Sequence, residues 1–102
     1  YGLSDLKRLI CSFSDECEEL MSSIRQAVAS NNELEIIRLA HQLKGLAVVM
    51  TAGSLSRAAL ALETSAKRGE VAQLAGLTDG LEQELTTVLS YIESRKSSPI
   101  FS

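Results

Sequence analysis

The chain has 102 residues, which is enough for a single domain. Hydrophobic residues make up 45% and aromatic residues only 4%, so the core must be built mainly from aliphatic side chains. The net charge of −3 argues against a nucleic-acid binder, and no apolar run approaches the ~20 residues of a membrane span.

Helical periodicity runs through nearly the whole chain, and no strand-like alternation of useful length is present. It predicts a domain over residues 1–96 and a flexible tail over residues 97–102. The predicted helices cover about residues 3–29, 33–50, 54–68 and 71–95. Four helices joined by short turns favour an all-α fold, an antiparallel up-down-up-down four-helix bundle.

Turn signals separate the four periodic segments. Asn31 and Asn32 end the first helix, and Asn32 can cap the second. Thr51–Ser54 supply the next turn, and Gly69 follows two basic residues at the end of the third helix. In the fourth helix, Gly76 and Gly80 allow for a kink or a late start.

The two cysteines, Cys11 and Cys17, lie six residues apart in the first predicted helix. This separation corresponds to about 9 Å along the helix axis, too far for a disulfide. We therefore expect reduced thiols and a cytoplasmic protein. The chain begins at Tyr1 and not at Met, which favours a segment of a longer protein.

The single histidine, His41, lies in the second predicted helix opposite its apolar stripe. That stripe consists of Ile36, Leu39, Ala40, Leu43, Leu46, Ala47 and Met50. We therefore expect His41 to face solvent or a shallow groove. The same outward face carries Arg38, Lys44 and Gly45, together with the aliphatic residues Leu34, Ile37 and Val48.

This combination of residues suits phosphoryl transfer. A neutral, exposed imidazole is a good nucleophile, and Lys44 can stabilise the charge that develops on phosphoryl oxygens. Gly45 would avoid crowding the imidazole or a partner, and the aliphatic residues would form a docking patch. A metal site is excluded, because His41 has no second ligand at helical spacing. Alternatively, Arg38 is an ordinary surface residue and the aliphatic patch is covered by the fourth helix or the N-terminal segment.

A longer pattern consists of the run Ala40–Ala47, then Leu55, Leu62 and Glu63, and then the run Lys67–Glu70. This pattern resembles the signature of histidine-containing phosphotransfer (HPt) domains, most closely those at the C-terminus of hybrid sensor kinases. The resemblance implies that His41 accepts the phosphoryl group on Nε2, that Lys44 is the neighbouring cation and that Gly45 clears space. It places Glu63 where a Gln or Glu commonly hydrogen-bonds the other imidazole nitrogen; a solvated helix residue is the alternative.

One position departs from the family pattern. HPt domains usually have a glycine ten residues after the histidine, but Thr51 stands there and the glycine follows at Gly53. Leu55 remains in register, so no insertion is needed. The conformation of this turn is therefore left open.

The resemblance implies a phosphoryl carrier with no cofactor of its own. Its expected partners are response-regulator receiver domains, which supply Mg²⁺ and a lysine, and we expect a monomer. There is no Gly-rich nucleotide-binding stretch, so the chain should not use ATP. Gln42 follows His41 and no proline is near, unlike the dimerising histidine domain of sensor kinases. The alternatives are a phosphotransfer module of a chemotaxis-type kinase and a non-catalytic helical adaptor.

Overall fold

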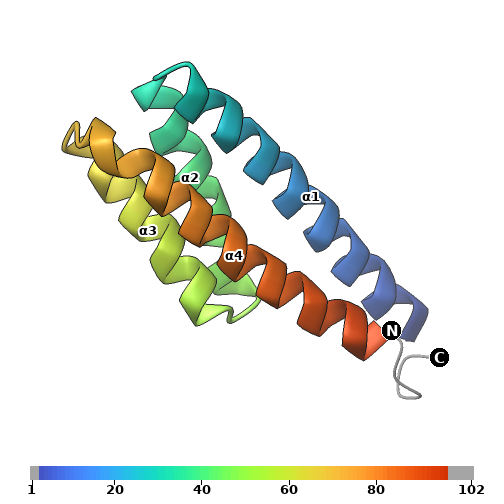
Figure 1. Ribbon diagram of the computed structural model, residues 1–102. Coiled ribbons are helices and arrows are strands. Elements are labelled where there is room, and N and C mark those ends of the chain that lie inside the picture. The colour runs from blue at the N-terminus through green and yellow to red at the C-terminus, as the bar shows by residue number, and fades with distance from the viewer. Residues whose placement is uncertain (1–2, 97–102) are drawn as a thin grey trace.

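The computed structural model describes the backbone of residues 3–96 and the side chains of residues 12–94. This part of the chain forms four helices: α1 (Leu3–Ala29), α2 (Glu33–Val49), α3 (Gly53–Lys67) and α4 (Val71–Lys96). They run up, down, up and down in an elongated bundle of 46 × 19 × 19 Å (Figure 1). Each helix packs against the next, and α1 also packs against α4. The prediction of an antiparallel four-helix bundle is confirmed.

The helix ends differ from the predicted ones by a single residue. α2 ends at Val49, α3 spans Gly53–Lys67, and α4 extends to Lys96. α4 begins at Val71 and continues unbroken through Gly76 and Gly80, so the late start considered for it does not occur. The predicted tail, residues 97–102, lies outside the described residues.

All three turns end the preceding helix with the same hydrogen-bond pattern. Two residues follow the C-terminal cap of each helix. The amide of the first one donates to the carbonyl three residues before it, and the amide of the second one donates to the carbonyl five residues before it. This is the Schellman motif, which places the residue after the cap in the left-handed region. In the three turns, the residues with positive φ are Asn31 (55°), Thr51 (54°) and Gly69 (71°).

Thr51 is the unusual member of this set. Gly and Asn enter the left-handed region readily, whereas a residue branched at Cβ does so only with strain. Thr51 stands where the resemblance led us to expect a glycine, and its backbone takes a conformation that glycine favours. Its hydroxyl donates to the carbonyl of Met50 at 2.6 Å. The turn therefore keeps the geometry of the Schellman motif although threonine is unfavourable at its left-handed position.

The start of α2 follows from its sequence. The side chain of Asn32 accepts a hydrogen bond from the amide of Glu35 at 3.3 Å and so caps the helix. Glu33 and Glu35 lie in the first turn, where carboxylates interact favourably with the helix dipole. The predicted cap at Asn32 is confirmed, and it fixes where α2 begins relative to His41.

The core is mainly aliphatic, as the composition requires. Burying one large aliphatic side chain contributes about 1.5–3 kcal/mol. Cys17 lies within this core as a free thiol, and burial, aided by Glu16 and Glu18, raises its pKa to about 12. Within residues 3–96, no helix combines the length and apolar character needed to cross a membrane. Among residues 12–94, the large aliphatic side chains that are almost completely buried are Ile24, Ile36, Leu43, Leu55, Leu62, Leu74 and Leu81.

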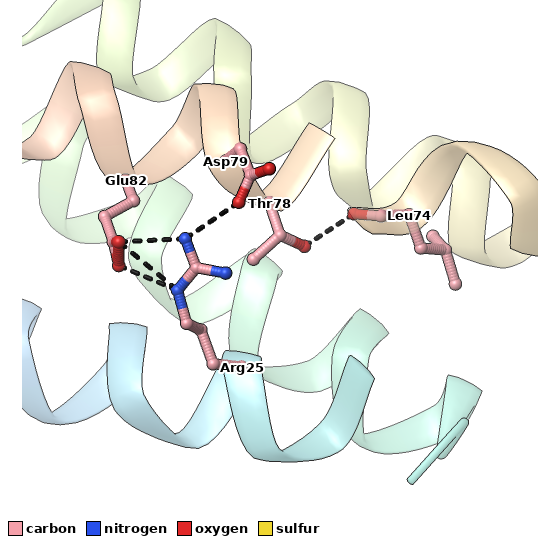
Figure 2. A network of polar contacts seen from close by, with 5 residues as sticks. All are labelled: Arg25, Leu74, Thr78, Asp79 and Glu82. Carbon is pink, nitrogen blue, oxygen red and sulfur yellow. Dashed lines mark hydrogen bonds and ion pairs between the residues drawn. The ribbon is translucent and has the colours of Figure 1, made fainter. Parts of the chain in front are cut away.

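A polar clamp joins α1 to α4. The Nε and Nη2 atoms of Arg25 each lie 2.8 Å from an oxygen of Glu82, and Nη2 also contacts Asp79 Oδ1 at 3.0 Å (Figure 2). One turn away, the buried Thr78 donates its hydroxyl to the carbonyl of Leu74 at 2.6 Å. The clamp lies on the α1–α4 side of the bundle, across from the α2–α3 side.

Candidate functional site

His41 lies near the middle of α2, on the side that faces away from the core. Its side chain is 66% exposed. The residues of the same helix that are fully buried are Ile36, Leu39, Ala40, Leu43 and Ala47. The helical wheel and the structure therefore agree on the orientation of the imidazole.

A buried carboxylate from α3 lies against His41. The Glu63 side chain is only 5% exposed, and its Oε1 lies 3.4 Å from His41 Nδ1. Oε1 is also 3.4 Å from Lys44 Nζ, and Oε2 is 2.9 Å from Lys67 Nζ. Glu63 is therefore not a solvated helix residue, because it lies between one imidazole and two ammonium groups.

These neighbours keep Glu63 ionised. Burial acts to raise the pKa of Glu63, since it removes water from the charged form. The hydrogen bond from Lys67, the charge of Lys44 and the contact with His41 act in the opposite direction and hold the pKa below its usual range. A carboxylate can only accept hydrogen bonds, so it favours the His41 tautomer with its proton on Nδ1. The Nε2 atom then keeps its lone pair.

Lys67 was not predicted from the sequence as a site residue. It lies one turn after Glu63 on α3, and such i,i+4 pairs of opposite charge are common on helices. That spacing was the available signal. The sequence did not show that Lys67 and His41 contact the same carboxylate, because this depends on the packing of α3 against α2.

Lys44 and Gly45 both lie beside His41 on α2, but they differ in their surroundings. Lys44 is 27% exposed and directs its ammonium group toward Glu63. A Cβ atom built at Gly45 would meet no atom within 4 Å. A Cβ at this position would therefore not crowd the imidazole within the domain itself, because the space beside Gly45 is open. Only an approaching partner could require that space.

The predicted docking residues are exposed, with one exception. Leu34 is 81% exposed and Val48 60%, so neither α4 nor α1 covers them. Arg38 is also exposed and pairs along its own helix with Glu35 and Gln42. Ile37, in contrast, is half-buried and packs against the core, which corrects its assignment as an exposed residue.

A groove between α1 and α2 adjoins the face of α2 that carries the predicted docking residues. This groove was not predicted from the sequence. Val49, which is 78% exposed, lies at the end of α2 beside it. Sequence reasoning assigned only residues of α2 to this surface because the position of α1 depends on tertiary packing. The groove is lined by Glu16, Glu19, Leu20, Ser23, Arg38, Leu39, Gln42, Gly45, Leu46 and Val49.

Comparison with known families identifies the class of this domain. The model of the Hpt domain family matches residues 8–91, most of the chain, and the chain therefore belongs to this family. The comparisons with curated proteins and with solved structures found no match. HPt domains are phosphocarrier modules of two-component phosphorelays: they carry out histidine phosphotransfer, interact with receiver domains and have no ATP site of their own.

Proposed function

We propose that His41 accepts a phosphoryl group from the aspartyl phosphate of one receiver domain and passes it to the aspartate of another. The observation that carries this proposal is the pairing of an exposed imidazole with a buried carboxylate at its Nδ1 atom. This pairing leaves Nε2 as the nucleophilic atom. Membership of the HPt family supports the same residue, because His41 is the only histidine in the chain.

The transfer step requires little chemistry from the HPt domain itself. The Nε2 lone pair forms a bond to phosphorus while the bond from phosphorus to the donor carboxylate oxygen breaks, and the donor aspartate leaves as a carboxylate. The proton stays on Nδ1, so the ring gains positive charge, which Glu63 stabilises in the way a triad carboxylate stabilises its imidazolium. In the second half of the relay, an aspartate of the next receiver attacks phosphorus and Nε2 leaves.

The other groups that take part in transfer come from both partners, the HPt domain and the receiver. In this proposal Lys44 turns from Glu63 to the phosphoryl oxygens; its ammonium lies 3.4 Å from Glu63 Oε1, and its side chain is 27% exposed. In this proposal the receiver supplies Mg²⁺ and a lysine, and the HPt domain contributes no cofactor. Leu34, Arg38 and Val48 flank His41 and form the docking surface, with Gly45 leaving room for the receiver.

We further propose that the domain acts as a monomer in the cytoplasm, as a segment of a hybrid sensor kinase. The resemblance of the His41 segment to C-terminal HPt domains supports this setting. Transient docking of receivers accounts for the exposed aliphatic residues Leu34 and Val48 without a second copy of the chain.

The experiment that tests the function is phosphoryl transfer from a radiolabelled, phosphorylated receiver. We expect label on the wild-type domain as an acid-labile, base-stable adduct and no label on His41→Gln. Circular dichroism of the variant controls for folding. If several phosphorylated receivers transfer nothing to the folded wild-type domain, the carrier function is wrong and a helical adaptor becomes the better hypothesis.

A further inference from the structure

We propose that Lys67 is a positioning residue for phosphoryl transfer, which acts on His41 through Glu63. This inference rests on the function proposed above. Lys67 Nζ lies 2.9 Å from Glu63 Oε2, the shortest of the three contacts that this carboxylate makes with basic groups. It therefore fixes one carboxylate oxygen and directs the other, Oε1, toward His41 Nδ1.

The two carboxylate oxygens have different partners, which separates the roles of the two lysines. Oε1 is shared by His41 and Lys44, each at 3.4 Å, whereas Oε2 contacts Lys67. If Lys67 is removed, Lys44 becomes the only lysine among the described contacts of Glu63. Its ammonium group would then be held at the carboxylate and would be less free to meet the incoming phosphoryl oxygens.

The balance of charge around Glu63 supports the same role for Lys67. The phosphoryl group brings negative charge close to Glu63, and two like charges at a poorly solvated site repel each other. Lys67 neutralises Glu63 from the side away from His41 and so reduces this repulsion. Its own side chain is 59% exposed, so its removal leaves the apolar core intact.

The test compares Lys67→Met with Arg68→Met and Lys67→Arg. Arg68 is the next residue along the chain, is exposed and makes none of the contacts described for Glu63, so its variant removes the same charge without touching the site. Phosphoramidate serves as a small donor: Nε2 forms a bond to phosphorus while the bond from phosphorus to nitrogen breaks and ammonia leaves. Phosphohistidine is followed by ³¹P NMR.

We expect Lys67→Met to react about tenfold more slowly than the wild type, which is the lower end of the loss seen when a group that orients a metal-binding histidine is removed. Arg68→Met should react at the wild-type rate, and Lys67→Arg should recover most of the loss. In a Glu63→Gln background there is no carboxylate for Lys67 to hold, so adding Lys67→Met should cause no further decrease. Equal rates for Lys67→Met and Arg68→Met would overturn the inference, as would an undiminished effect in the Glu63→Gln background.

A second readout needs no phosphoryl donor. Long-range ¹H–¹⁵N NMR of His41 reports which imidazole nitrogen carries the proton, and we expect the Nδ1–H tautomer to be less populated in Lys67→Met than in Arg68→Met. An unchanged tautomer ratio would count against the inference. If the tautomer shifts but no receiver transfers label to the wild type, the relay function fails while the role of Lys67 in positioning His41 stands.

Discussion

His41 on α2 and Glu63 on α3 are separated by 22 residues, yet their Nδ1 and Oε1 atoms lie 3.4 Å apart. The pair joins an exposed nucleophile to a buried anion. Contacts of this kind are often long before a reaction and shorten when charge develops. This relationship leads to the first of five predictions.

Glu63→Leu should slow phosphoryl transfer to His41 by about tenfold or more, because the imidazole loses the group that orients it and stabilises its positive charge. Glu63→Gln should be affected less, since its amide oxygen can still accept a hydrogen bond from Nδ1. The measurement is the initial rate of transfer from a phosphorylated receiver, with thermal unfolding as the folding control. Equal rates for the Leu variant and the wild type would show that the contact has no role in transfer.

Glu63 should also make the stability of the domain depend on acid pH. Its pKa in the folded state is lowered from the ordinary value of 4.5, so near that pH the unfolded chain binds more protons than the folded one. The stability that Glu63 contributes is therefore complete above the ordinary pKa and is lost as the pH falls through the folded pKa. Urea unfolding from about pH 7 down to about pH 3 should show a smaller decrease for Glu63→Gln than for the wild type. Glu35 and Glu82, whose pKa values are also lowered, are present in both proteins and cancel in the comparison.

Thr51→Gly should stabilise the domain. The left-handed conformation costs a residue with a branched Cβ about 1–2 kcal/mol, and the greater freedom of glycine in the unfolded chain offsets about half of this. We expect a net gain of about 0.5–1 kcal/mol in the free energy of unfolding, measured in urea. Gly69→Ala is the matched control in the third turn and should destabilise by a similar amount, because Gly69 has a φ of 71°. A destabilising effect of Thr51→Gly would show that the hydroxyl contact with Met50 outweighs the backbone strain.

Gly45→Ala should separate the effect of this position on stability from its effect on docking of the receiver. Alanine favours the helix by about 0.5–1 kcal/mol, and its Cβ meets nothing within 4 Å, so the free energy of unfolding should rise. If a receiver approaches closely here, its transfer rate to His41 should fall by about tenfold, which corresponds to ~1.4 kcal/mol. The reaction with phosphoramidate, a much smaller donor, should be unchanged. A receiver-dependent rate equal to that of the wild type would remove Gly45 from the docking surface.

Arg25→Met should destabilise the bundle modestly and leave transfer unaffected. Arg25 bridges Asp79 and Glu82 between α1 and α4, but the groups are substantially exposed, so we expect a loss of about 1 kcal/mol or less. The loss should shrink at high salt, because exposed ion pairs are screened. Urea unfolding at low and high salt, beside transfer assays, checks both expectations. A large change in transfer rate would show that the clamp and His41 are coupled.

The sequence allowed the helices, the cap at Asn32 and the outward orientation of His41 to be predicted, because these features depend on local spacing. Periodicity on α2 determines which side of that helix is apolar, and Asn31 and Gly69 are recognisable turn residues. The same local rules did not predict the left-handed conformation of Thr51, because threonine disfavours it. It is adopted because the hydrogen bonds of the turn require it.

Features that depend on packing between helices were harder to predict from the sequence. The partners of Glu63 come from two helices, so the full set could not be obtained from α3 alone, and Lys67 was overlooked. Ile37 was placed on the exposed face because a helical wheel does not show how far a neighbouring helix wraps around it. The groove beside Gly45 likewise requires the position of α1.

The clamp of Arg25 and the cluster around Glu63 lie on opposite sides of the bundle and share no residue. Phosphorylation of His41 would therefore alter the electrostatics of the contact between α2 and α3 and leave the contact between α1 and α4 unchanged. We expect the loaded and unloaded forms to have the same backbone. Information would then travel through the relay as a chemical group, which the next receiver reads directly, and not as a change of shape in the molecule that delivers it.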